Sequence, residues 1–312
     1  MGVRNRYERY IWIVLLYTIV VILWGAVVRA TGSGAGCGDH WPLCNGEVIP
    51  RAPEVETLIE LSHRITSGFL LFIIAWMTYQ AFKLYPKGDI VRKGAVATLI
   101  FVIIEALIGA LLVLFELVAH NASLTRAVSM AAHLVNTLLL LAAITLTGLW
   151  ARGVAAPVLR NQRRLIIWTV VGVLMMMLLG ASGGIAALGD TLFPKTSFVD
   201  GLYKDLDPTS NLLLRLRVAH PAIAVGTGFV MVIIAQLFRG AFPTPQVSKT
   251  ANILIGSYVA QLVLGTINVV LYAPIPIQIL HLFLADVIWI TFVILVGLGF
   301  AKPSDKEAPA HA

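Results

Sequence analysis

Eight apolar segments dominate this sequence, and each is long enough to cross a lipid bilayer as a helix. A spanning helix needs roughly 20 apolar residues, and within lipid a helix satisfies its own backbone hydrogen bonds. The segments cover residues 10–28, 62–82, 94–116, 129–150, 164–187, 217–238, 250–272 and 278–300. Proline and glycine lie in the connections between them. The pattern predicts an all-α integral membrane protein with eight transmembrane helices.

The composition agrees with this prediction. The 312 residues are 58% hydrophobic and 12% charged, whereas a soluble domain carries about 25% charged residues. This excludes a disordered chain, a solvated repeat protein and an ordinary cytosolic enzyme. The net charge of +7 comes from short basic clusters between apolar segments, which is typical of a membrane protein and does not indicate nucleic acid as a partner.

The basic residues also predict an orientation. With the N-terminus inside, fifteen of the 23 Lys and Arg residues fall on the inner side, so the positive-inside rule predicts that both termini are cytoplasmic. The first apolar segment is long for a signal peptide, and Arg29 follows it, so we expect a retained helix. A Ser-rich, acid-poor transit sequence does not precede it. The expected location is therefore the plasma membrane of a prokaryote.

Short matches between the two halves of the sequence indicate a duplication. Two long outer loops, residues 29–61 and 188–216, occupy corresponding places. The aligned pairs are Glu105–Gly109 with Gln261–Gly265, Gly25-Ala26 with Gly180-Ala181, and Trp41-Pro42 with Phe193-Pro194. We predict two tandem four-helix bundles, residues 1–150 and 151–312, related by a pseudo-two-fold axis along the membrane normal.

Four histidines form the most informative pattern. His63, His133, His220 and His281 lie in the first turns of the second, fourth, sixth and eighth segments, which all run inward and therefore place the four imidazoles at similar depth. One such histidine is usually a hydrogen-bonded helix-start residue, but four at equivalent places favour a function. Imidazoles that face each other from neighbouring helices suit axial ligation of haem iron. Zinc or copper is the alternative, although no Cys, Asp or Glu ligands are grouped with all four.

Five arginines lie at the same outer level as these histidines. They are Arg29, Arg64, Arg126, Arg215 and Arg217. Haem propionates need cationic or hydrogen-bonding partners, so each arginine is a candidate for that role or for supporting a ligand. The alternative for each is ordinary interfacial snorkelling.

A carboxylate and a cysteine pair accompany the first histidine. Glu60 lies three residues before His63, on the same face if the helix extends that far. It is a candidate for relaying protons or stabilising positive charge at a reacting carbon, and the alternative is interaction with the helix dipole. Cys37 and Cys44, the two cysteines of the chain, lie in an outer and oxidising loop, so we expect a disulfide. It would be either a staple or a redox-active pair.

Two further acidic residues fall inside apolar segments. Glu105 lies in the third segment and Asp286 in the eighth. We expect both to be neutral or hydrogen-bonded inside the bundle, and a proton path is the alternative.

The segment from Thr31 to Cys44, followed by Glu60-Leu-Ser-His63-Arg64, resembles the haem A synthase family, and the resemblance covers essentially the whole chain. It implies eight helices in two halves. It also implies a membrane oxidoreductase that oxidises the C8 methyl group of haem O to a formyl group, first to an alcohol and then to an aldehyde. The product, haem A, serves terminal oxidases in cytochrome oxidase assembly.

The resemblance also implies roles for single residues. It assigns His63 and His133 to the substrate haem O, and His220 and His281 to the iron of a haem b cofactor that passes electrons from an external donor. Glu60 matches the catalytic carboxylate of the family. Cys37 and Cys44 match a loop pair tied to activity or haem handover.

This sequence departs from the family pattern at three places. The later outer loop has no cysteines, Glu105 stands where Gln is common, and Pro221 replaces an Arg after His220, which moves the arginine role to Arg217. A non-catalytic di-haem b electron carrier and a haem-handling assembly factor are the alternative functions. The expected partners are haem O, an electron donor that the sequence does not identify, haem O synthase, oxidase assembly proteins and a second copy of the chain.

Overall fold

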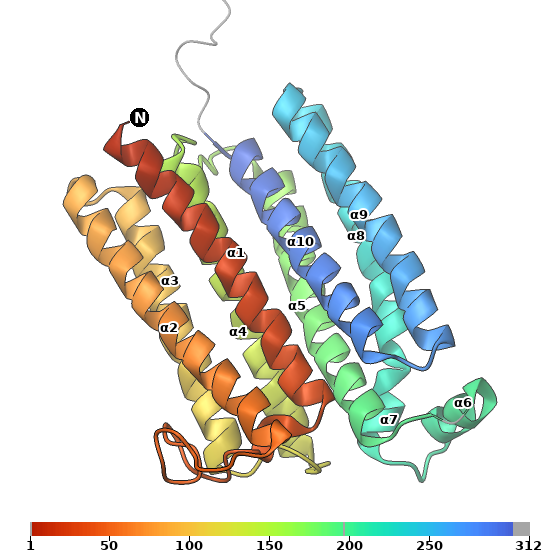
Figure 1. Cartoon of the computed structure of the whole chain (residues 1–312). Coiled ribbons are helices and arrows are strands. Elements are labelled where there is room, and N and C mark those ends of the chain that lie inside the picture. Colours follow the sequence, from red (N-terminus) through yellow and green to blue (C-terminus); the bar gives the residue numbers. More distant parts are fainter. Residues whose placement is uncertain (1, 196, 302–312) are drawn as a thin grey trace, which may run out of the picture.

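The computed structural model describes residues 2–195 and 197–301 and consists of long helices joined by loops, two of which are long (Figure 1). The elements are α1 (Val3–Ala30), the 3-10 turn η1 (Ser33–Ala35), α2 (Val55–Leu84), α3 (Ile90–Leu114), α4 (Leu124–Ala151), α5 (Arg163–Leu192), α6 (Phe198–Leu206), α7 (Leu212–Arg217), α8 (Ala219–Ala241), α9 (Pro245–Val270) and α10 (Ile275–Gly299). Eight spans among them are long and apolar enough to cross a membrane. The predicted all-α membrane fold is confirmed.

Most of the helices extend beyond the apolar segments that predicted them. α1 begins at Val3 instead of residue 10, and α2 begins at Val55 instead of residue 62. These added turns are polar, so a search for apolar runs does not detect them. Side chains fix several starts: Asp89 accepts from the Val91 amide at the start of α3, and Ser123 accepts from the Arg126 amide at the start of α4.

The sixth predicted segment is divided into two helices. α7 ends at Arg217 and α8 begins at Ala219. Pro221 explains the break, because its ring collides with the carbonyl of the residue four positions earlier, which is Arg217, and it has no amide hydrogen to donate. The predicted long loop before this span also contains the short helix α6.

The long helices pack as two neighbouring groups (Figure 1). In the first group α1 contacts α2 and α4, and α3 contacts α2 and α4. In the second, α8 lies between α5 and α9, and α9 packs on α10. α1 and α4 meet α5 and α10 across the boundary. The exact domain boundary and the pseudo-two-fold relation stay predictions, and residues 302–312 of the second half lie outside the described residues.

One buried core runs through all eight spans. Ile11, Ile74 and Leu141 from the first group share it with Met231 and Phe292 from the second. Large apolar side chains also remain on the outer faces, where Phe72 is 73% exposed and Phe229 is 69% exposed. Exposed apolar surface on this scale suits contact with lipid.

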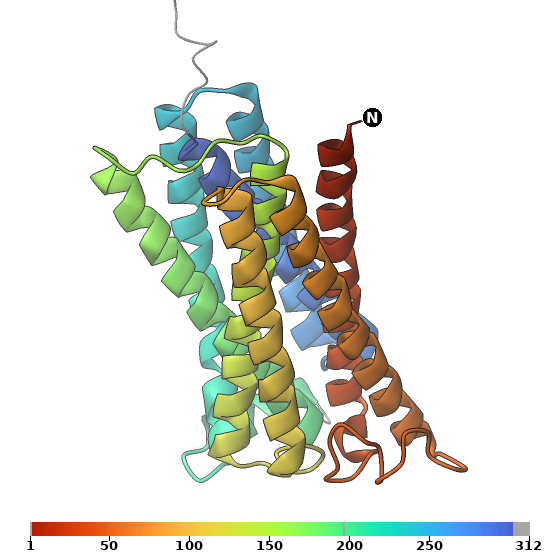
Figure 2. The same cartoon turned by 90° about the vertical axis from the view of Figure 1, so that its left-hand side faces the viewer.

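Both long loops lie at the same end of the bundle, opposite the N-terminus (Figures 1 and 2). We call this the long-loop end; it comprises residues 31–54, 115–123, 193–195, 197–211 and 271–274. α2, α4, α7 with α8, and α10 all begin there. The four histidines therefore lie near this end, as the sequence predicted.

Candidate functional site

The four histidines lie inside the bundle as two pairs. His220 and His281, on α8 and α10, have ring centroids 6.5 Å apart with an angle of 76° between the rings. His63 and His133, on α2 and α4, are near enough for their imidazoles to interact electrostatically. All four side chains are half-buried. Each pair comes from two helices of one group, and these are the pairs that the family resemblance implied.

Glycines make room for three of these rings. A Cβ atom at Gly25 of α1 would lie 3.0 Å from His63 Cε1, and one at Gly183 of α5 would lie 3.0 Å from His220 Cε1. A Cβ atom at Gly265 of α9 would lie 3.1 Å from His281 Cε1. These distances are tighter than most carbon contacts, so a side chain there would require the imidazole to shift by a few tenths of an ångström.

This arrangement corrects one detail of the sequence alignment. The alignment paired Gly25 with Gly180, but a Cβ atom at Gly180 would contact Leu134 and Leu138 of α4. Gly183, almost one turn later, is the glycine that faces a histidine. The short matching strings could not detect this shift, because both positions are glycine within one glycine-rich turn.

The carboxylate of Glu60 is buried about one turn before His63 on the same helix. Its side chain is on α2, which does extend back far enough to include it, and the residue is 3% exposed. Oε2 accepts a hydrogen bond from the backbone amide of Cys37 at 2.8 Å. Oε1 accepts from Arg64 Nε at 3.0 Å and from a second nitrogen of that guanidinium at 2.5 Å. The carboxylate is thus held at both oxygens.

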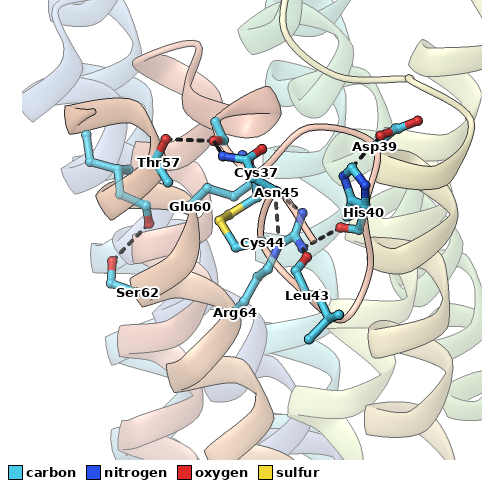
Figure 3. The surroundings of a disulfide bond; sticks show 12 residues. Cys37, Asp39, His40, Leu43, Cys44, Asn45, Thr57, Glu60, Ser62 and Arg64 are labelled. Carbon is cyan, nitrogen blue, oxygen red and sulfur yellow. Dashed lines mark hydrogen bonds and ion pairs between the residues drawn. A yellow bond between two sulfur atoms is a disulfide. The ribbon is translucent and has the colours of Figure 1, made fainter. Parts of the chain in front are cut away.

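The predicted disulfide between Cys37 and Cys44 is present, and both cysteines are fully buried. Its loop folds over the start of α2 and covers Glu60 (Figure 3). Arg64 donates from Nη1 to the backbone oxygens of His40 at 2.6 Å and Leu43 at 2.7 Å. The same guanidinium therefore binds both the carboxylate and its cover. A redox role for the pair stays a prediction.

A second contact joins the loop to the same helix. Thr57 donates from Oγ1 to the Gly36 carbonyl at 2.7 Å. Gly36 lies directly against the backbone of α2, since a Cβ atom there would be 2.5 Å from the carbonyl carbon and oxygen of Glu56. The loop is therefore seated on α2 by backbone contact as well as by Arg64.

Arg29 is the predicted arginine that joins the two groups of helices. From the end of α1 it donates through Nη1 to Ala187 O at 2.7 Å and Thr191 Oγ1 at 2.6 Å, both on α5. Nη2 donates to Gln278 Oε1 on α10 at 2.9 Å. Arg29 is thus a connection between the groups.

The remaining predicted arginines also have protein partners. Arg126 donates to Ala119 O at 2.6 Å and Asn121 O at 2.8 Å, and its Nε is buried without a partner among the described residues. Arg215 is exposed, with a long contact of 3.4 Å to Pro208 O. A propionate role for these arginines stays a prediction.

Arg217 lies in an ion-pair network that sequence reasoning missed. It is 6% exposed and pairs with Asp205 and, at 2.7 Å, with Asp190. Lys195 lies 3.9 Å from Asp190 and 3.8 Å from Asp205. The network fastens the loop before α7 to the end of α5. The only sequence signal was two acids flanking a basic residue in that loop.

Two acids inside the spans differ in their surroundings. Asp286 on α10 is 2% exposed, and its Oδ2 has no hydrogen-bond partner among the residues the structure describes. Glu105 on α3 instead lies 3.4 Å from His133 Nδ1. Within residues 2–195 and 197–301, no three His, Cys, Asp or Glu side chains gather in a way that could hold a metal ion.

Comparisons with known proteins identify relatives of the whole chain. A family model described as "Cytochrome oxidase assembly protein" (COX15-CtaA) matches residues 8–293. A Thermus thermophilus protein named "Protoheme IX farnesyltransferase" is 48% identical over 302 residues, which is 97% of this chain and 50% of that protein. The chain therefore spans about half the length of this relative.

Shorter matches link the chain to a second group of named proteins. A "Heme A synthase" of Bacillus mycoides is 40% identical over 107 residues, covering 33% of this chain and 34% of that protein. A "Heme A synthase" of Bacillus cereus is 39% identical over the same length, with the same shares of the two chains.

Proposed function

The chain belongs to the family of cytochrome oxidase assembly proteins (COX15-CtaA), and we propose that it makes haem A by oxidising the C8 methyl group of haem O. The names of the Bacillus relatives support this reaction class. The observation that carries the proposal is the buried Glu60 carboxylate, one turn before His63 and covered by the disulfide loop. An electron carrier or a haem scaffold does not need such a group.

The second histidine pair has dimensions that suit a haem b cofactor. Metal–nitrogen bonds to imidazole are about 2 Å long, so two imidazoles on opposite sides of one iron have ring centroids roughly 6 Å apart. The separation of His220 and His281 is 6.5 Å. Because Gly183 and Gly265 have no side chains, the two rings can pack closely against α5 and α9. When bound, haem b supplies one-electron transfer.

We assign the substrate haem O to His63 and His133. This assignment rests on Glu60, which lies on the same helix as His63. A fixed carboxylate near a reacting methyl group stabilises positive charge that develops at the carbon and accepts the proton released there. Arg64 and the Cys37 amide hold the two oxygens in place, and the loop restricts access of bulk water to them.

The name of the Thermus relative points to a second candidate function, prenyl transfer to haem. Half of that relative lies outside the alignment, so its name does not say which half performs the transfer. The two reactions need different substrates: haem O and electrons for methyl oxidation, and haem b with farnesyl diphosphate for prenyl transfer. An assay with both substrate sets separates them.

The test is a conversion assay with the purified full chain in detergent. The protein receives haem O, a reductant and oxygen, and the extracted haems are separated and weighed by mass spectrometry. We expect haem A or its alcohol precursor. Unchanged haem O beside bound haem b would contradict the proposal, and haem O produced from haem b with farnesyl diphosphate would support prenyl transfer instead.

A variant tests which half holds the cofactor. His220→Ala removes one axial ligand, so we expect the low-spin haem b absorbance to be lost while haem O still binds in the first half. The matched control is His120→Ala, an exposed loop histidine, which should keep the spectrum. If the haem b signal survives His220→Ala, the assignment of the halves is wrong.

A further inference from the structure

The two histidine pairs differ in one neighbour. In the first group, Glu105 of α3 lies with Oε1 3.4 Å from Nδ1 of His133. Asn136 donates to Oε2 of this carboxylate at 2.5 Å, and Thr137 donates to Oε1. Asn136 also donates to the Phe101 carbonyl of α3 at 2.9 Å. The carboxylate is therefore fixed by the two residues that lie one turn beyond His133 on α4.

In the second group an uncharged amide approaches the other ring nitrogen of its histidine: the contact is at Nε2 of His281, whereas the carboxylate of the first group lies beside Nδ1 of His133. Gln261 of α9 lies with Nε2 3.3 Å from His281 Nε2 and donates to the His281 carbonyl at 3.0 Å. One turn beyond His281, where α4 has Asn136 and Thr137, α10 has Leu284 and Ala285, which have no side-chain donor. The charge and the donors that fix it thus occur together in the first group and are both replaced in the second.

A carboxylate beside the outer nitrogen of a metal-bound imidazole changes the metal. Where the ring nitrogen hydrogen-bonds to the carboxylate, the contact fixes the ring orientation and makes the imidazole a stronger electron donor; Nδ1 of His133 and Oε1 of Glu105 are 3.4 Å apart, within ion-pair range and without such a bond. A negative charge near the iron also stabilises the more oxidised state, and hydrogen bonding and charge around the ligands set the reduction potential of a haem. An amide has no net charge and exerts a weaker effect.

We propose that Glu105 is a positioning residue that makes the two haem sites electronically different: through His133 it lowers the midpoint potential of the first-half haem relative to the second-half haem beside Gln261. The inference rests on the proposed assignment of one haem to each histidine pair. Glu105 lies in the first half, and this is also the half to which the oxidation of the haem O methyl group is assigned.

A redox titration of the full chain loaded with haem b tests this without turnover. In a His220→Ala background the second-half haem is removed and one transition remains. We expect Glu105→Gln to raise the midpoint potential of that haem. The expected change in the ferric-to-ferrous equilibrium constant is about tenfold, which is ~59 mV for one electron. Glu105→Asp retains the charge and should restore most of the difference.

The reverse change provides an independent arm in the other half. In a His63→Ala background, Gln261→Glu combined with Leu284→Asn and Ala285→Thr rebuilds the carboxylate and its two donors beside His281. We expect the midpoint potential of the second-half haem to fall by a similar factor. The electron paramagnetic resonance g values of each ferric haem should shift in the same variants, because they respond to the donor strength of the axial imidazole.

The outcomes separate this inference from the proposed function. Unchanged potentials and g values in both arms, in variants that still bind haem, overturn the role of Glu105 while haem O conversion can still stand. Shifted potentials without conversion of haem O support the role of Glu105 and overturn the synthase. If the first half binds no haem in the His220→Ala protein, both are overturned.

Discussion

At the scale of single residues, the best-defined group in the molecule is Glu60. It is one of the few acids buried within a span, and its two oxygens are held by two different parts of the chain, the Cys37 amide and Arg64. The helix-dipole alternative explains an acid at a helix start. It does not explain why a loop folds over that acid.

We expect Glu60→Gln to retain haem binding and to lose activity by about 100-fold or more, since a neutral amide cannot accept a proton or stabilise positive charge as a carboxylate does. The measurement is the initial rate of haem O oxidation at matched haem content. Glu56→Gln is the control, because Glu56 lies one turn earlier on α2 and is exposed. Equal rates for the two variants would remove Glu60 from the reaction.

At the scale of elements, the two long loops are fastened to their helices by different chemistry. The first uses the disulfide, Arg64 and backbone contact at Gly36. The second uses the ion pairs of Arg217 with Asp190 and Asp205. Each mode of attachment can be tested with one substitution and a control substitution nearby in the same loop.

For the first loop, Gly36→Ala should shift the loop away from α2. Overpacking against rigid backbone typically costs about 1–3 kcal/mol, and the added methyl would lie 2.5 Å from Glu56 backbone atoms. Thermal unfolding in detergent measures the loss. Gly34→Ala is the control, because its nearest neighbour atom is 3.4 Å away on Val118; equal stability of the two variants would contradict the close contact.

For the second loop, Asp205→Asn leaves Arg217 with Asp190 as its remaining acidic partner at hydrogen-bond distance. Removing one member of a buried ion pair costs about 3 kcal/mol, so the midpoint of thermal unfolding should fall clearly. Asp200→Asn breaks an exposed pair with Lys204, whose side chain is 50% exposed, and exposed pairs contribute about 1 kcal/mol or less. If Asp200→Asn lowered the midpoint of thermal unfolding more than Asp205→Asn, the network would not stabilise the loop.

At the scale of the whole molecule, the two groups of helices are joined by α1 and α4 meeting α5 and α10. Polar contacts reinforce this boundary. Trp289 of α10 donates from Nε1 to the Leu138 carbonyl of α4 at 2.7 Å, and Arg29 donates from α1 to both α5 and α10. The relative placement of the two histidine pairs depends on these contacts.

Arg29→Met tests the connection. The substitution removes three hydrogen bonds from a charged donor, each of which contributes about 1.5–3 kcal/mol, so we expect the free energy of unfolding to fall by roughly 2 kcal/mol or more. Chemical denaturation in detergent provides the measurement. Arg51→Met, at an exposed loop position, should unfold like the native chain, and a normal stability of Arg29→Met would show that apolar packing alone holds the groups together.

The sequence predicted the eight spans, the disulfide and the level of the four histidines, because apolar length and helix direction determine them. It could not predict α6, the break before α8 or the partners of Arg64. Arg64 binds the backbone carbonyls of His40 and Leu43. Every residue has a carbonyl, so the sequence does not indicate which ones Arg64 binds. The shift from Gly180 to Gly183 depends on helix rotation, which short matches do not report.

The contact between Cys37 and Glu60 is made by a main-chain amide. Replacing Cys37 by any residue other than proline therefore retains this donor, and the hydrogen bond is then lost only if the path of the loop changes. Reduction of the bond between Cys37 and Cys44 would therefore act on Glu60 by letting the loop move. The carboxylate would then lose the Cys37 amide and become exposed to solvent in the same step.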